Sequence, residues 1–259
     1  PASCARAPSS ATPRPTAGPG IMLVGSSTAS RTAPRPIPSG ATMPTSAPRG
    51  EVSNLEDDGF GVYVSGKYAY LTLRNNLGGG QSYLKIIDIE DPDLPQVKST
   101  LNLGLSNARG LYVSGRYAYI VFQQSSSGAN ALRVVDISSV SNPVIVSGTI
   151  PDLPSDVLRI FVAGKYAYLT TVNSDCSKQF IILDISNIQS IQTVGVLSSC
   201  SSEAPEVGAR NIFISGHYAY VHFSGAPEDP DNSRLVIIDL TGIEAVSGHI
   251  SSLEVGDLQ

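Results

Sequence analysis

Apolar and polar residues alternate along this chain in a short pattern that occurs four times. In the first copy, an apolar run ends at Gly66, and glycine can adopt the positive φ of a tight hairpin turn. In the strand that follows, Tyr68 and Tyr70 would project from one face, and the small or aliphatic residues beside them from the other. Each copy therefore predicts two antiparallel strands joined by a hairpin. The four copies are VYVSGKYAYLTL (62–73), LYVSGRYAYIVF (111–122), IFVAGKYAYLTT (160–171) and IFISGHYAYVHF (212–223).

A second signature follows each copy and ends in an aspartate. In the first repeat it is YLKIID, which is apolar enough for a strand buried on both faces. The stretch EDPDLP then predicts a turn, and QVKSTLNL predicts a fourth strand. The hairpin glycines are 49, 49 and 52 residues apart, and such a period with four short strands is typical of a β-propeller blade. The aspartates are Asp88, Asp136, Asp184 and Asp239.

We predict an all-β fold, a β-propeller of four-stranded antiparallel blades, for residues 51–259. Large tyrosines on one face of a blade would cover the small apolar side chains of the next, whereas a single blade would leave both faces in water. After a fourth strand predicted at VSGHISSL (246–253), the chain ends in EVGDLQ, which corresponds to the linker into another blade. We therefore interpret the four visible repeats as a fragment of a larger propeller, with a closed four-bladed ring as the alternative. The repeats span about 55–104, 105–153, 154–204 and 205–259.

The YAY triplets and the segments of the LKIIDIE type, taken together, resemble the LVIVD repeat, whose pattern is roughly sGxYAYv, a gap, and LvIvDIsdPxxP. The resemblance covers about residues 59–250, and both motifs occur in order four times. It implies a β-propeller in an exported or surface protein of a bacterium or archaeon, with no general catalytic activity. The third and fourth copies lack the proline after the aspartate (DISNIQS and DLTGIEA), which leaves their turn type open.

Residues 1–50 differ in composition from the rest of the chain. They contain ten of the eighteen prolines and five arginines, but no lysine, acidic or aromatic residue. Such a segment cannot bury enough apolar surface to offset the entropy lost on ordering, so we predict disorder. The run IMLVG is too short to span a membrane. The composition and the missing initiating Met are compatible with a transit peptide, a linker or stalk, or a mistranslated reading frame, in a fragment or processed product.

From residue 51 onward the chain is acidic, with twelve Lys and Arg against all twenty-two Asp and Glu and a formal net charge of −10. This balance argues against nucleic acid, whose phosphates require basic patches, and against anionic membrane surfaces. No apolar stretch is long enough to span a bilayer. The partner that we expect is an unidentified protein or carbohydrate ligand, and the sequence predicts no cofactor.

Two of the three cysteines belong to the third repeat. Cys176 lies in the predicted loop between the second and third strands, and Cys200 follows the fourth strand. Both loops emerge at the same end of an up-and-down blade, so we predict a disulfide and, with it, an oxidising compartment. Two unpaired thiols are the alternative, and neither spacing resembles a metal or redox motif. Cys4 is expected to be free.

The four repeated aspartates could bind metal ions, one per blade, or could accept hydrogen bonds from the turn amides that follow them. Their identical placement favours the structural interpretation, and we predict no metal site. The loop GAPEDPDNSR (225–234) has oxygen ligands that suit Ca²⁺ but lacks the usual spacing, so we interpret it as a solvated loop. Further acidic residues predicted at that end would make it negative and favour cations or basic partners. They are Asp57, Asp58, Asp152, Asp156, Glu203 and Glu206.

Arginines occur at the start of the innermost predicted strand in three repeats: Arg109, Arg210 and, one position later, Arg159. In a propeller this strand borders the central channel, so the guanidinium groups could line the channel mouth. They could anchor an anionic ligand there, and they are our candidate ligand-binding residues. Pairing with the acidic loops is the interpretation that we favour.

No group of residues predicts catalysis. The three histidines are scattered, and the chain contains no GxSxG, HExxH or P-loop motif. One of them, His217, replaces the Lys or Arg found at the hairpin tip of the other repeats. We therefore predict a non-catalytic binding or structural module of a secreted or cell-surface protein. The alternatives are an enzyme, a hydrolase or lyase whose site at the channel mouth lies largely in missing blades, and an intracellular scaffold with reduced cysteines.

Overall fold

The computed structural model describes residues 48–53, 55, 58–74, 80–123, 131–147, 153–154, 156–172, 179–198, 208–224, 233–243 and 255–256. The chain divides into two units, Pro1–Ala47 and Pro48–Gln259, and all of these residues belong to the second. The disorder predicted for residues 1–50 therefore concerns a segment that lies almost wholly outside the described residues. The described part contains no helix that is long and apolar enough to cross a membrane.

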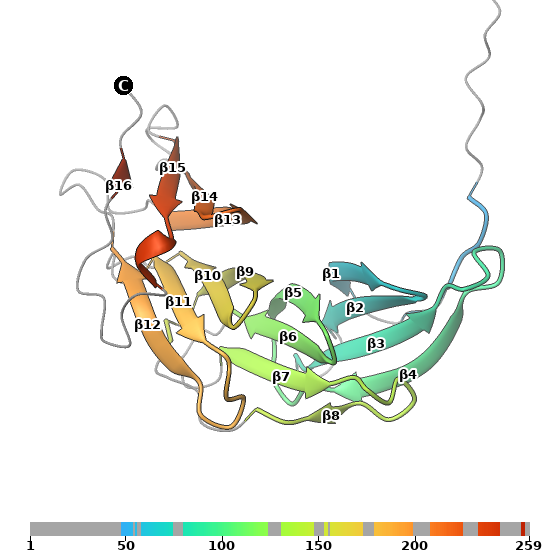
Figure 1. The fold of residues 1–259 in the computed structure, drawn as a ribbon. Helices are drawn as coiled ribbons and strands as arrows, with labels where there is room; N and C mark the ends of the chain where they lie inside the picture. The colour runs from blue at the N-terminus through green and yellow to red at the C-terminus, as the bar shows by residue number, and fades with distance from the viewer. Residues whose placement is uncertain are drawn as a thin grey trace, which may run out of the picture. The chain divides into compact units, whose positions relative to one another are not determined.

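Four antiparallel sheets of four strands each follow one another along the second unit (Figure 1). Strands that are consecutive in sequence pair with each other in every sheet, which confirms the predicted propeller blades. The first blade contains β1 (Asp58–Ser65), β2 (Tyr68–Arg74), β3 (Ser82–Asp88) and β4 (Gln96–Asn102). The second contains β5 (Ala108–Ser114), β6 (Tyr117–Phe122), β7 (Leu132–Asp136) and β8 (Val144–Ile145). The third contains β9 (Val157–Ala163), β10 (Tyr166–Thr171), β11 (Phe180–Asp184) and β12 (Gln192–Leu197). The fourth contains β13 (Gly208–Ser215), β14 (Tyr218–Ser224), β15 (Arg234–Asp239) and β16 (Val255–Gly256), with a 3₁₀ turn at Thr241–Ile243.

A two-residue hairpin joins the first two strands of each blade. Its glycines, at positions 66, 115, 164 and 216, all have φ of 57–58°, which confirms the turn predicted from the sequence. The residue after the third strand closes on this hairpin. In the second blade, the Ile137 amide donates a hydrogen bond of 2.9 Å to the Arg116 carbonyl, and the equivalent bonds in the other blades measure 2.7–2.9 Å.

The outer strand of the fourth blade differs from our prediction. It is β16, which lies in the EVGDLQ segment that we interpreted as a linker, and it pairs with Ile237 and Ile238 of β15. The stretch VSGHISSL, where we predicted this strand, lies outside the described residues. A strand of two residues is too short for the alternation of apolar and polar residues to identify.

The apolar core lies between the sheets, in three layers. The face of a blade that carries the tyrosines of its second strand is called the tyrosine face, and the opposite face is called the alanine face. In each layer, the tyrosine face of one blade packs against the alanine face of the next. Between the third and fourth blades, Tyr168 and Phe180 contact a cluster that includes Ala219, Val221 and Phe223. The other two layers have the same composition, which confirms that tyrosines of one blade cover the small apolar side chains of the next.

An aromatic ladder runs across the first strands of the four blades, which contact one another in chain order. The ring centroids of Tyr63 and Tyr112 are 4.9 Å apart, those of Tyr112 and Phe161 are 4.9 Å apart, and those of Phe161 and Phe213 are 5.8 Å apart. Tilted aromatic pairs at such distances stabilise beyond their buried area. Burial, together with a hydrogen bond to Tyr63, raises the pKa of Tyr112 to about 12.

Candidate functional site

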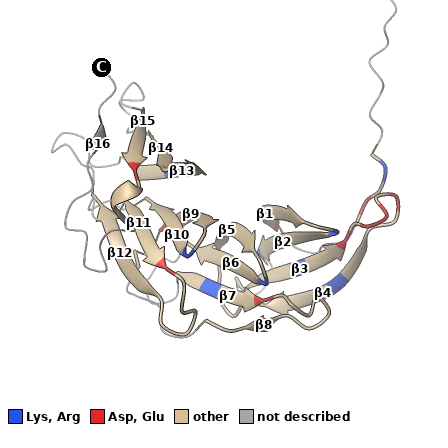
Figure 2. Ribbon diagram, in the orientation of Figure 1, with Lys and Arg blue, Asp and Glu red and all other residues tan. Residues whose placement is uncertain are grey.

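The repeated aspartates take part in the turns that follow the third strands. Each carboxylate accepts a hydrogen bond from the backbone amide two residues further on, at 2.8–3.0 Å, which confirms the structural interpretation of these residues. The Arg116 guanidinium, followed by hydrogen bonds from Ser138, holds the pKa of Asp136 well below its usual range. The hydrogen bond from the Glu90 amide likewise lowers the pKa of Asp88. Figure 2 shows acidic residues at these strand ends.

A cation lies over a tyrosine ring at the hairpin tip of three blades. Arg116 lies 5.4 Å from the ring centroid of Tyr117, and Lys165 lies 5.1 Å from that of Tyr166. Lys67 and Tyr68 repeat the arrangement in the first blade, at 5.7 Å. A cation near an aromatic face is attracted by the negative charge above the ring. The repeated charges at this end therefore stabilise the hairpins.

The arginines predicted at the channel mouth do not occupy equivalent positions. In every blade the first strand carries a β-bulge, and one residue is left out of the pairing with the second strand. That residue is Arg109 in the second blade and Arg210 in the fourth, but Leu158 in the third. Arg159 instead pairs across from Thr170, and its guanidinium donates to the Leu158 carbonyl at 3.0 Å. Arg210 donates to the Ser224 hydroxyl at 3.0 Å.

Phe60, the bulge residue of the first blade, lies beside two guanidinium groups. Arg109 is 4.8 Å and Arg74 is 5.1 Å from the centroid of its ring. Arg74 also donates to the Asn107 side chain at 2.8 Å and lies 4.0 Å from Asp58. Arg109 therefore lies over an aromatic ring. The arginine that approaches an acid here is Arg74, which the sequence did not identify.

Several predicted features lie outside the described residues. They include the disulfide between Cys176 and Cys200, and Cys4. Most of the acidic loop 225–234 also lies outside them, as do Asp57, Asp152, Glu203 and Glu206, so the predicted pairing of arginines with these acids stays a prediction. Among the described acids, Asp156 accepts a hydrogen bond of 2.9 Å from the Gln123 amide group. The described residues contain no group of three or more His, Cys, Asp or Glu that could hold a metal ion.

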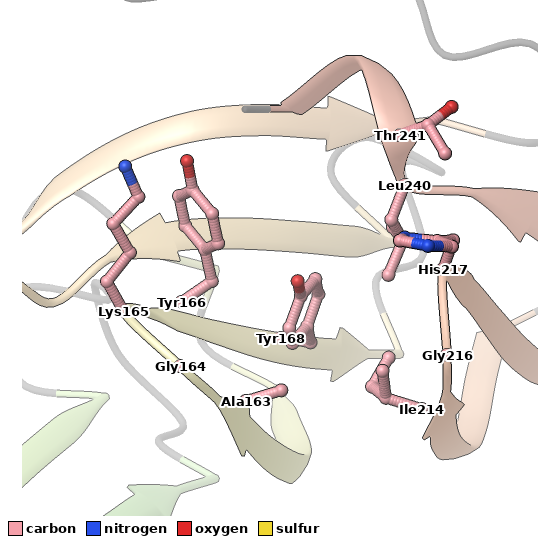
Figure 3. A pocket seen from close by; sticks show the side chains of 10 residues that line it. All are labelled: Ala163, Gly164, Lys165, Tyr166, Tyr168, Ile214, Gly216, His217, Leu240 and Thr241. Carbon is pink, nitrogen blue, oxygen red and sulfur yellow. The ribbon is translucent and has the colours of Figure 1, made fainter. Parts of the chain in front are cut away.

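A cavity of about 370 Å³ lies between the third and fourth blades, at the hairpin end (Figure 3). Two hairpins and one strand end form it: the β9–β10 hairpin with Lys165, the β13–β14 hairpin with His217, and the turn after β15 with Thr241. The rings of Tyr166 and Tyr168 form part of its wall. Because an imidazole is shorter than the Lys or Arg side chain at the other hairpin tips, His217 leaves more room here than its counterparts would.

Each polar side chain named here can donate a hydrogen bond into this cavity. Lys165 supplies an ammonium group, His217 an imidazole and Thr241 a hydroxyl, and no carboxylate is among the described lining residues. Two aspartates neighbour the lining residues: Asp184 pairs across from Tyr166, and Asp239 precedes Leu240. Burial raises the pKa of Asp184, but the hydrogen bonds from Ser186 and the charge of Lys165 together outweigh it, so the pKa is lowered. The hydrogen bond from the Thr241 amide lowers the pKa of Asp239. The arrangement suits a ligand rich in hydrogen-bond acceptors.

The sequence did not predict this cavity. Its two hairpins lie about one repeat apart, and only the packing of one blade on the next brings them together. One signal was available, because His217 breaks the Lys or Arg pattern of the other hairpin tips. In a repeat protein, a polar residue that departs from the repeat pattern is a better guide to a site than the residues that follow it.

A family model for the LVIVD repeat matches the chain four times, at residues 58–102, 106–148, 155–196 and 208–241. No curated protein matches it. Among solved structures, the computationally designed Ika4 protein is similar over 74% of this chain and 97% of its own, with 9% identity and a TM-score of 0.51. YjhT is 13% identical over 78% of this chain and 65% of its own, with a TM-score of 0.45. Apo AztD from Citrobacter koseri is 15% identical over 72% of this chain and 58% of its own, with a TM-score of 0.35. At such identities a likeness concerns the fold alone.

Proposed function

Because the chain belongs to the LVIVD-repeat family, we propose that it is a non-catalytic binding module of an exported or cell-surface protein. The ligand that fits the cavity between the third and fourth blades is a carbohydrate. The observation that carries this proposal is the polar part of the lining, where Lys165, His217 and Thr241 can each donate a hydrogen bond. Sugars present many oxygen acceptors, which the donors of this cavity can satisfy.

The use of the repeated charged residues supports a non-catalytic role. Asp136 and Asp184 accept hydrogen bonds from the amides of their own turns, and Arg116 lies over the ring of Tyr117. General acid–base catalysis requires a group that can reach a substrate and exchange a proton near neutral pH. Carboxylates with a lowered pKa that are already hydrogen-bonded to turn amides serve that purpose poorly.

Saturation-transfer NMR with the full chain tests the proposal, using cellohexaose, xylohexaose and hexagalacturonate as probes. We expect at least one of them to bind, and we expect Lys165→Gln and His217→Ala each to weaken its affinity at least about tenfold, the effect of one lost charged or polar contact. Lys67→Gln is the matched control, because Lys67 has the same hairpin position in the first blade. Loss of binding in the control as strongly as in the cavity variants would place the ligand elsewhere.

Mass spectrometry of the recovered oligosaccharides distinguishes binding from catalysis. A non-catalytic module returns every probe with its original mass and chain length. Shortened chains would indicate a hydrolase, and unsaturated products would indicate a lyase, so either result would favour the enzyme alternative. Failure of all three probes to bind would overturn the carbohydrate assignment.

A further inference from the structure

Two arginine side chains at the junction of the first and second blades each bury a nitrogen atom that has no hydrogen-bond partner. They are Arg74 and Arg109, and the buried atom is Nε in both. In the part of the chain that the structure describes, the other buried side-chain atoms without a partner are two threonine hydroxyls, which carry no charge. Buried polar groups are nearly always paired, and leaving a charged group unpaired costs the most. These two arginines therefore require an explanation beyond the stability of the fold.

Both arginines lie beside the same aromatic ring, although they come from different blades. Arg74 is the last residue of β2, and Arg109 is the bulge residue of β5. Their guanidinium groups lie 5.1 Å and 4.8 Å from the ring centroid of Phe60, the bulge residue of β1. An aromatic ring attracts a cation but leaves its positive charge in place. The packing of the two blades thus brings two positive charges close together.

The described neighbours of these arginines do not neutralise the two charges. Arg74 donates a hydrogen bond of 2.8 Å to the side-chain oxygen of Asn107, which is uncharged. The Asp58 carboxylate lies 4.0 Å from Arg74, beyond hydrogen-bonding distance, and its side chain is 61% exposed, so this pair contributes little. No described residue accepts a hydrogen bond from Arg109 or forms an ion pair with it. Among the described residues, two cations therefore face one distant carboxylate.

Other arginines in comparable places have an acceptor within the chain. Arg210 occupies the bulge of β13, as Arg109 occupies that of β5, and it donates to the Ser224 hydroxyl at 3.0 Å. Arg159 donates to the Leu158 carbonyl at 3.0 Å. Of the three arginines that the sequence predicted at the channel mouth, Arg109 is thus the one without an acceptor in the described part of the chain.

We propose that Arg74 and Arg109 bind an anionic group of a ligand: a carboxylate, a sulfate or a phosphate. Such a group offers two or more charged oxygen acceptors, and the planar fork of a guanidinium can bind two of them at once. Both side chains are partly exposed, so a ligand can reach them from solvent. Asn107 and Phe60 restrict the motion of the two groups before binding, which reduces the entropy lost when the ligand binds.

The proposed anion site is separate from the cavity between the third and fourth blades. That cavity lies at the hairpin end, whereas Arg74 lies at the other end of β2. No lining residue of the cavity takes part, so anion binding and carbohydrate binding can be tested independently. Because the chain carries a formal net charge of −10 from residue 51 onward, its general attraction for anions is weak, and binding depends on the two arginines.

An NMR titration of the full chain tests the proposal, with the arginine Nε–H resonances as the readout. Sodium malonate, sulfate and phosphate are the probes, at an ionic strength held constant with sodium chloride. We expect at least one of them to shift the resonances of Arg74 and Arg109 with saturation, at a dissociation constant below about 10 mM. The resonance of Arg210 should not follow the same curve, because its guanidinium already has an acceptor. The probe that binds most tightly identifies the anionic group.

Three variants separate a specific site from general attraction. Arg109→Gln should weaken binding of that probe at least about tenfold, as the loss of a charged hydrogen-bond donor does. Arg109→Lys keeps the charge but not the planar fork, so it should weaken binding as well. Arg210→Gln is the matched control, because it removes one charge from the same bulge position of the fourth blade, and it should leave the affinity unchanged. Melting curves followed by circular dichroism check that each variant is folded, and the wild-type titration does not depend on them.

Several results would overturn the proposal. They are the absence of a saturable shift with all three probes, an equal shift at Arg210, unchanged binding by Arg109→Lys, and an equal loss of affinity in Arg210→Gln. The sequence also allows an acid of the chain itself to pair with these arginines, and Asp57→Asn tests this alternative. If the probes bind this variant but not the wild type, an acid of the chain occupies the arginine pair and the proposal is wrong.

Discussion

The third and fourth blades carry the same two sequence signatures and bury them to different extents. Tyr166 of the third blade is 7% exposed, whereas Tyr218, at the same position in the fourth, is 45% exposed. Local pairing is alike in the two blades, since both tyrosines begin the second strand opposite the aspartate that ends the third. The difference therefore arises from packing between blades: the fourth blade covers the tyrosine face of the third, whereas no described blade covers that of the fourth.

The comparison shows that most of the apolar stabilisation belongs to the contacts between blades. A repeat protein is held together by the intrinsic stability of each repeat and by the interfaces between nearest neighbours. Hairpin glycines and turn aspartates contribute to the intrinsic stability of every blade. The tyrosines contribute to the interfaces between blades, and only where another blade packs against them.

Removing a tyrosine ring should produce the largest contrast between the two blades. Tyr166→Ala leaves a cavity between the third and fourth blades and should lower the free energy of unfolding by about 3 kcal/mol. Tyr218→Ala removes a ring that is largely in water, and should change that free energy by about 0.5 kcal/mol or less at concentrations where the chain is monomeric. Urea unfolding followed by circular dichroism measures both. Equal losses would mean that the tyrosine face of the fourth blade is covered in solution.

The predicted disulfide would make the third blade more stable than the fourth in a second way. A bond between Cys176 and Cys200 closes a loop of 25 residues and should contribute roughly 3 kcal/mol, most of which a reductant should remove. Peptide mapping of protein prepared without reductant should find the two residues in one linked fragment. If iodoacetamide labels both thiols in the native protein, the bond and the inference of an oxidising compartment fail together.

Replacing a hairpin glycine should reduce stability by a similar amount in every blade, in contrast to replacing a tyrosine. Gly115→Val forces a β-branched residue to a φ of 57°, and should destabilise by about 1 kcal/mol or more. No atom lies within 4 Å of the added Cβ, so this loss reflects backbone strain and not a collision. Gly115→Asn is the control and should cost less, since asparagine tolerates this conformation. Gly216→Val in the fourth blade should match Gly115→Val in the shift of its melting temperature.

Acid should have the smallest of these effects, and it should weaken the aspartate turns of all four blades. The pKa of each repeated aspartate is lowered in the folded chain, for Asp136 chiefly by Arg116. A lowered pKa in the folded state stabilises above the unfolded value, near 3.9, and this contribution is lost as the pH falls through the folded value. The melting temperature should therefore fall between about pH 5 and pH 2, and less steeply in Asp136→Asn. A parallel pH profile for this variant would contradict the assignment.

The fold could be predicted from the sequence because its determinants are local. A glycine such as Gly115 sets the hairpin, alternation on β6 sets the two faces, and both recur at a fixed period. The aspartate turns follow from the same regularity. These features require no knowledge of which blade lies beside which.

The candidate site could not be predicted in the same way, because it depends on departures from the repeat. Phe60 occupies the same bulge position in the first blade that Arg109 occupies in the second. Only the fold shows that the Phe60 ring lies beside the Arg109 guanidinium. The cavity at Lys165 and His217 likewise requires two hairpins from different blades. Sequence spacing gives the position of each residue within its blade, but not its neighbours across the interface.

The three separate layers of the core have a consequence for how this chain comes apart. Each layer joins only two consecutive blades, so a terminal blade can open by breaking one layer while the other two stay closed. In the part of the chain that the structure describes, loss of structure should begin at the first and fourth blades, which share one layer each, and move inward through partly folded states. The same independence applies over evolutionary time. A duplication or deletion of one whole repeat in the gene would add or remove one layer, and would leave every remaining tyrosine with a partner of the kind it has now.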